Sequence, residues 1–111
     1  MPSPIAWFDN QSNNVDLTAE FYAKMLDLSV QQGPGFPMLC GGEGPFASVS
    51  SSVNGRTGWL PYFEVVDLEP AEHRARENGG EVVEERRRGP AGEYVIIKDP
   101  GGTLFALWKR G

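Results

Sequence analysis

The sequence is poor in the two side chains that most often bind metals or act as activated nucleophiles. It contains one cysteine, Cys40, and one histidine, His73. A single cysteine cannot form an intrachain disulfide, which fits a reducing compartment. No histidine lies near Cys40 in the sequence, so a Cys–His nucleophile is not predicted. His73 lies beside charged residues of a helical segment, where a histidine usually faces solvent.

The chain also lacks long apolar runs and an excess of basic residues. No stretch approaches the roughly 18 apolar residues of a membrane span, and the first residues do not resemble a signal peptide. The net charge is −5, and the one basic run, Arg86–Arg88, follows two glutamates as in an exposed hairpin tip. We therefore expect a cytoplasmic protein with neither nucleic acid nor a membrane as partner.

Fourteen glycines and nine prolines divide the 111 residues into short segments, and the length predicts a single domain over 1–111. Residues 5–9 predict a strand, and Asp16 is the expected N-cap of the helix that follows. Apolar residues recur there at helical spacing, at Leu17, Phe21, Met25 and Leu28, with Ala19, Tyr22 and Leu26 widening the stripe. Three short strands are predicted next, at 29–32, 36–40 and 46–53.

The second half repeats this order. Residues 60–66 predict a strand, and a helix follows from Asp67, with Pro70 in its first turn, to Gly79 and Gly80. Its apolar face is thin, with only Leu68, Ala71 and Ala75 on it, so we expect the weaker of the two helices, either shallowly packed or covered by a partner subunit. Three further strands are predicted, at 81–85, 93–98 and 103–109.

The predicted fold is α+β, with two tandem βαβββ modules at about 4–54 and 58–109. An internal repeat of this kind excludes an alternating βαβαβ nucleotide-binding fold, because strands come in threes after each helix. One module alone cannot bury both its helix and its sheet. Because a chain this short has a lean core, a homodimer is the expected assembly.

Three stretches carry a resemblance to a known superfamily. They are residues 16–28, the segment Gly58-Trp59-Leu60-Pro61-Tyr62-Phe63, and the C-terminal run from Asp99-Pro100-Gly101-Gly102 to Trp108. In order and spacing, the chain resembles the vicinal-oxygen-chelate superfamily of glyoxalases, bleomycin resistance proteins and dioxygenases, and its glyoxalase-like subgroup in particular. The resemblance implies curved mixed sheets around a cleft that takes a small molecule.

The resemblance also implies four metal-ligand positions, one on each of four strands. They fall on Trp7, Ser48, Leu60 and Ala106. None of these is a usual ligand for a divalent metal. We therefore expect no bound metal and no cofactor. An oxygen-only site built from Asp9, Glu64 and Glu93 is conceivable, but their spacing does not demand it.

Side chains alternate between the two faces of a strand, so the same four positions indicate which residues line the cleft. Ala6, Phe8, Phe63, Val65, Phe105 and Leu107 are expected to face the helices, and Ser50 and Leu104 the cleft. The predicted ligand-binding residues are Trp7, Asp9, Ser48, Leu60, Tyr62, Glu64, Ala106 and Trp108. Asp9 or Glu64 becomes a candidate general base if burial raises its pKa.

The leading hypothesis is metal-free binding of a small organic molecule in the cleft, as in the drug-sequestering members of the superfamily. One alternative is a metal-dependent lyase or dioxygenase of the same superfamily. Another is a non-catalytic interaction module whose cavity is filled by its own aromatic side chains. The sequence leaves open the identity of the ligand, whether any reaction is catalysed, and whether the modules pair within one chain or between two.

Overall fold

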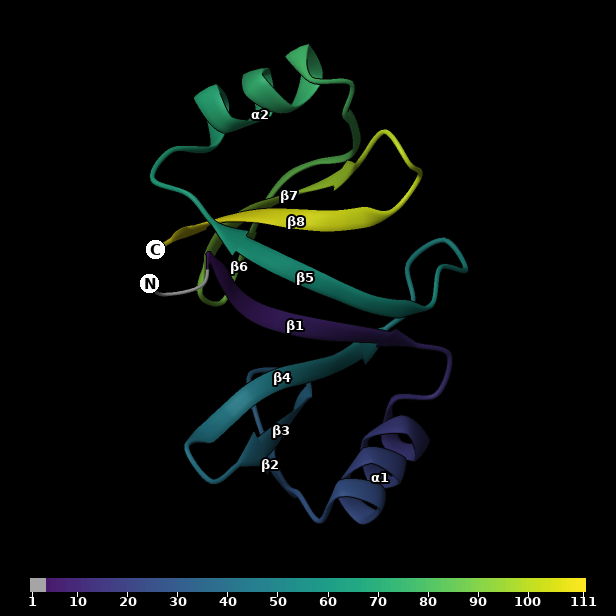
Figure 1. The fold of residues 1–111 in the computed structure, drawn as a ribbon. Coiled ribbons are helices and arrows are strands. Elements are labelled where there is room, and N and C mark those ends of the chain that lie inside the picture. Colours follow the sequence, from purple (N-terminus) through teal and green to yellow (C-terminus); the bar gives the residue numbers. More distant parts are fainter. Residues whose placement is uncertain (1–3) are drawn as a thin grey trace. The chain divides into compact units, whose positions relative to one another are not determined.

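The computed structural model describes residues 4–111 and contains eight strands and two helices, which confirms the α+β class (Figure 1). The elements are β1 (Ile5–Ser12), α1 (Val15–Leu26), β2 (Ser29–Gln32), β3 (Pro37–Gly41), β4 (Gly44–Ser51), β5 (Gly58–Glu64), α2 (Leu68–Glu77), β6 (Glu81–Gly89), β7 (Gly92–Lys98) and β8 (Leu104–Arg110). No helix within residues 4–111 is long and apolar enough to cross a membrane.

Two compact units make up the chain, and the boundary between them falls inside β1 and β5. One unit is Trp7–Leu60, and the other comprises Pro61–Gly111 with the residues that precede Trp7. The predicted module boundaries at 4–54 and 58–109, and a cleft formed by the modules, stay predictions.

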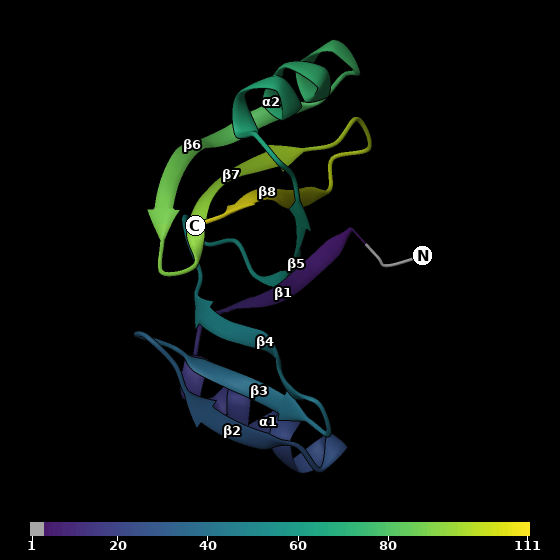
Figure 2. The same cartoon turned by 90° about the vertical axis from the view of Figure 1, so that its left-hand side faces the viewer.

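In the unit Trp7–Leu60 the strand order is β2-β3-β4-β1, with β1 parallel to β4 and the other pairs antiparallel. Helix α1 lies against this sheet (Figure 2). The buried core between them consists of Ala19 from the helix and Leu39, Ala47 and Val49 from the strands. Small alanines on both sides allow a close approach of helix and sheet.

Helix α1 begins and packs differently from the prediction. Its N-cap is Asn14, not Asp16, and the Asn14 Oδ1 accepts a hydrogen bond of 3.1 Å from the Leu17 N–H. The helix presents Val15, Ala19 and Tyr22 to the sheet. Of the predicted apolar stripe, Ala19, Tyr22 and Leu28 pack on the core. The side chains of Leu17, Phe21 and Met25 are more than half exposed. Two apolar stripes run side by side along this helix, and spacing alone does not say which one is covered.

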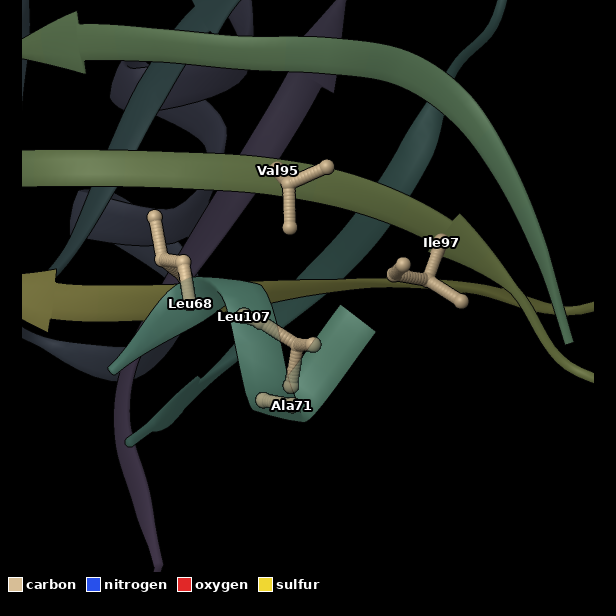
Figure 3. Packing of buried hydrophobic residues seen from close by; sticks show 5 residues of the cluster. All are labelled: Leu68, Ala71, Val95, Ile97 and Leu107. Carbon is tan, nitrogen blue, oxygen red and sulfur yellow. The ribbon is translucent and has the colours of Figure 1, made fainter. Parts of the chain in front are cut away.

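In the second unit the strand order is β5-β8-β7-β6, with β5 parallel to β8 and the other pairs antiparallel. The core of this unit joins α2 to β7 and β8 (Figure 3), and it consists of Leu68, Ala71, Val95, Ile97 and Leu107. Phe63, Val65 and Phe105 pack against the same cluster. The alternation of side chains predicted this orientation.

The thin apolar face of α2 contains a buried charge. Glu72 is only 3% exposed. Its Oε2 lies 2.6 Å from the Nε of Arg86, so the two side chains form an ion pair. Their relative orientation does not allow a hydrogen bond between these atoms. Arg76, one turn further along α2, is 3.9 Å from the other carboxylate oxygen. Arg86–Arg88 are exposed and lie beside the β6–β7 turn, as predicted, although they do not form the turn itself. These residues lie within β6, the turn follows at Gly89–Gly92, and Arg86 pairs with the helix.

Candidate functional site

A chain of hydrogen bonds joins three of the predicted ligand-binding residues in the unit Trp7–Leu60. The Trp7 Nε1 donates to the Ser48 Oγ at 2.9 Å, and the Ser48 hydroxyl donates to the Asp9 Oδ1 at 2.8 Å. The Ser50 hydroxyl donates to the other carboxylate oxygen at 2.6 Å. The register of the parallel pair β1–β4, which places Asp9 opposite Ser48, brings these groups together. An indole is thereby held at a fixed distance from a buried carboxylate.

Burial raises the pKa of Asp9, and the hydrogen bonds from Ser50 and Ser48 oppose that rise without cancelling it. The cause is desolvation, because the interior disfavours the charged carboxylate more than the neutral acid. Asp9 is therefore easier to protonate in the folded protein than in the unfolded chain. A cationic group placed beside Asp9 would lower its pKa again and so favour the charged carboxylate.

We expect Asp9→Asn to stabilise the protein increasingly as the pH rises. A raised pKa means that the folded state holds the proton longer, so wild-type stability falls as the pH rises from about 4 through the pKa of Asp9. Asparagine does not titrate, so the difference in unfolding free energy between the two proteins should grow as the pH rises. Urea unfolding of both proteins from acidic to slightly alkaline pH measures it. Glu43→Gln, in an exposed turn, is the control and should show no such trend; a pH-independent difference for Asp9→Asn would contradict the account.

Four of the predicted residues share one face of the second unit's sheet, the face away from α2. They are Tyr62, Glu64, Ala106 and Trp108. Tyr62 is opposite Ala106 and Glu64 is opposite Trp108 in the parallel pair β5–β8. The sequence reasoning missed Tyr94, which is opposite Trp108 on β7 and whose ring centroid lies 5.8 Å from that of Tyr62. Alternation with the buried Val95 could have assigned Tyr94 to this face.

Glu64 is held by a residue that the sequence analysis also missed. The Nε and Nη2 of Arg110 donate to the two carboxylate oxygens of Glu64 at 3.1 and 3.0 Å. The same guanidinium lies over the Trp108 ring, 4.8 Å from its centroid. Such two-pronged pairing fixes the orientation of both side chains. Glu64 is therefore an ion-pair partner, a role that does not suit a general base.

The four positions that the superfamily resemblance assigns to metal ligands do not fit a divalent metal. Trp7 uses its only polar atom to donate to Ser48, and the Ser48 hydroxyl is engaged by both Trp7 and Asp9. Leu60 and Ala106 are buried and have no donor atom. Within residues 4–111, no three His, Cys, Asp or Glu side chains are grouped so that they could hold a metal ion.

The oxygen-only alternative finds no support in the contacts of its three members. Asp9 accepts hydrogen bonds from two serines, and Glu64 is bound by Arg110. Glu93 lies 3.9 Å from Arg88. His73 is exposed and lies 3.5 Å from Glu77, as a solvent-facing histidine would, and Cys40 is buried with a free thiol.

Among the surface hollows that residues 4–111 form, two stand out, and neither is lined by the predicted ligand-binding residues. One, of about 660 Å³, lies at the start of α2 and includes Glu72 and Arg86. The other, of about 570 Å³, lies beside the first half of α1 and includes Asn10 and Trp59. The predicted residues thus come together through contacts within each unit, on sheet faces outside these two hollows.

The eight strands and two helices have the fold of the glyoxalase/bleomycin resistance protein/dioxygenase superfamily, as the resemblance predicted. The chain belongs to the glyoxalase-like domain family, whose model matches residues 7–108. Among curated proteins it is similar to the anthracycline biosynthesis protein DnrV of Streptomyces peucetius, with 27% identity over 136 aligned positions. That alignment includes 99% of this chain and 48% of the relative, so the chain spans about half the length of DnrV.

Solved structures show the same fold at low sequence identity. A glyoxalase/bleomycin resistance protein/dioxygenase superfamily member from Vibrio splendidus 12B01 matches with a TM-score of 0.67 and 16% identity, over 95% of this chain and 97% of that one. Methylmalonyl-CoA epimerase from Mycobacterium tuberculosis also matches with a TM-score of 0.67, at 22% identity, over 100% of this chain and 93% of the epimerase. These likenesses concern the fold alone.

Proposed function

We propose that this glyoxalase-like protein binds a small organic molecule without a metal, on the sheet faces that the helices leave uncovered. The observation that carries the proposal is the fixed pair of Trp7 and Asp9, joined through the Ser48 hydroxyl. An indole face attracts flat and cationic groups, and a neighbouring carboxylate strengthens the attraction to a cation. Apolar walls with a few fixed polar groups are typical of small-molecule sites.

The second unit supports the same class of ligand by its own composition. Its face away from α2 has the rings of Tyr62, Tyr94 and Trp108, with the ion pair Glu64–Arg110 beside them. Arg110 already covers one side of the Trp108 ring. Aromatic side chains bring a large contact area at low entropic cost, so this face suits a flat ring system.

The name of the relative DnrV points to the same chemistry. It is described as a protein of anthracycline biosynthesis, and anthracyclines contain a flat polycyclic aromatic system. We propose a flat aromatic cation as the ligand class for this chain. The homodimer, the cytoplasmic location and the absence of a cofactor stay predictions.

Thermal unfolding with 9-aminoacridine, a flat aromatic cation, tests this proposal. The wild-type midpoint should rise with probe concentration and saturate, because a ligand that binds only the folded state stabilises it. Trp7→Ala should weaken binding at least about tenfold, the loss of a cation–π contact and its buried area. Phe8→Ala is the matched control, because Phe8 is the next residue, lies beside Ala47 on the opposite face of the sheet and is 40% exposed.

Two results would count against the proposal. One is the absence of any shift with the wild-type protein. The other is an equal loss of affinity in Trp7→Ala and Phe8→Ala, which would mean that the indole has no specific part in binding. Neutral acridine at slightly alkaline pH should bind more weakly than 9-aminoacridine if the carboxylate of Asp9 contributes.

A further inference from the structure

We propose a second binding site, the hollow of about 570 Å³ beside the first half of α1, for a neutral aromatic molecule that carries a carbonyl or carboxamide group. Its lining residues include Asn10, Phe21, Tyr22 and Trp59, all of which lie in the unit Trp7–Leu60. Asn10 follows Asp9 on β1, so its side chain is on the opposite face of the strand from the Trp7–Asp9 pair. This site is therefore independent of the function proposed above.

Three aromatic rings form one wall of the hollow and hold one another in place. The rings of Phe21 and Tyr22 meet edge to face at 5.2 Å, and those of Tyr22 and Trp59 at 5.3 Å. The Trp59 Nε1 donates to the Tyr22 hydroxyl at 3.2 Å. Even so, Phe21 is 56% and Trp59 43% exposed. The folded chain thus fixes an apolar wall and leaves it open, as a preformed ligand site would.

A side-chain carboxamide that solvent can still reach lies at the same hollow. Asn10 is 7% exposed, and its side chain makes no hydrogen bond to any residue in the described range 4–111. Neighbouring polar groups are already engaged, since the hydroxyls of Ser12 and Thr18 are bonded to each other at 2.6 Å. The amide of Asn10 offers N–H donors and a C=O acceptor to the hollow, so a ligand with a carbonyl or carboxamide group can pair with it.

The remaining lining residues indicate the charge of the occupant. None of the residues around this hollow is charged, in a chain whose charged residues make up 23% of the sequence. A charged ligand would lose its hydration here without gaining an ion pair. The volume lies within the usual range of small-molecule pockets, and fixed aromatic rings beside an amide suit a small flat molecule better than the convex helix of a second copy.

Titration of ¹⁵N-labelled protein with naphthalene-2-carboxamide tests this site. Saturable shifts are expected at the Trp59 indole N–H and the Asn10 side-chain amide. Naphthalene-2-carboxylate, the charged match, should bind at least about tenfold more weakly. Asn10→Leu should weaken binding of the carboxamide about tenfold, as expected for one lost hydrogen-bonded pair, and should leave binding of naphthalene itself nearly unchanged.

Two further variants keep the test decisive if Asn10→Leu does not fold. Phe21→Ala removes an exposed ring of the wall and should weaken binding of every naphthalene probe. Leu26→Ala, at an exposed position of α1 outside the hollow, should change nothing. The proposal is overturned if the carboxamide does not saturate, or if its shifts map to Trp7 instead. It is equally overturned if sedimentation shows a dimer that Phe21→Glu dissociates while no probe binds, because a second copy would then occupy the hollow.

Discussion

Replacing Arg86 by methionine is expected to lower the free energy of unfolding by about 1–3 kcal/mol, the usual loss when a buried polar group loses its nearest partner. Glu72 is 3% exposed and cannot turn out to water from the middle of α2. Its closest cation is Arg86 at 2.6 Å, and Arg76 at 3.9 Å is too far to replace it fully. Without Arg86, the carboxylate is left buried and largely uncompensated. Urea unfolding measures the loss.

The double variant Glu72→Leu/Arg86→Met separates the two halves of this argument. Replacing a buried ion pair by apolar side chains of similar size is often neutral, so the double variant should recover to within about 1 kcal/mol of the wild type. Arg87→Met is the control, because Arg87 is exposed and 3.9 Å from its acidic partner, and such pairs contribute little. A double variant as unstable as Arg86→Met alone would show that the arginine acts by packing and not by charge.

The second large effect is expected at Gly92, where Gly92→Ala should cost about 3–5 kcal/mol or prevent folding. Gly92 begins β7 with a φ of +141°, and a Cβ there would lie 2.1 Å from the Lys109 carbonyl oxygen and 2.7 Å from the Gly111 nitrogen. Both are backbone atoms, so β7 and β8 would have to part where they are hydrogen-bonded. Urea unfolding or circular dichroism shows the effect.

Gly102→Ala is the matched control for Gly92→Ala. Gly102 also has a positive φ, of +96°, but nothing lies within 4 Å of the position of its Cβ. Only the backbone strain remains, which should cost about 1–2 kcal/mol. Equal losses in the two variants would show that strain, and not the contact with Lys109, determines the stability at Gly92.

The sequence predicts the element types well because glycine and proline mark each turn. Where one face of a strand is apolar, the alternation of side chains also determines which residues face the helix. Phe63, Val65 and Phe105 face α2 for this reason. The packing of α1 was not predictable in the same way. Its exposed stripe with Leu17 and Phe21 is as apolar as the stripe with Ala19 and Tyr22 that packs on the sheet, and helical spacing fits both.

The sequence could predict only the part of the candidate site that lies on directly paired strands, where the strand register decides which side chains are neighbours. Alternation and the superfamily resemblance together bring Trp7, Asp9 and Ser48 to one face, and the structure joins them by hydrogen bonds. Arg110 was missed because an exposed terminal arginine has no pattern of its own; only its distance to Glu64 reveals its role. Glu72 and Arg86 pair across elements far apart in the sequence, which neither periodicity nor composition indicates.

The most direct test of metal-free binding is a calorimetric titration of 9-aminoacridine into protein from which metals have been removed with EDTA. The indole of Trp7 and the carboxylate of Asp9 need no metal to bind a flat cation, so the account predicts one saturable site per chain. Addition of zinc or nickel should leave its affinity unchanged. Binding that appears only after a divalent metal is restored, at one ion per chain, would contradict it.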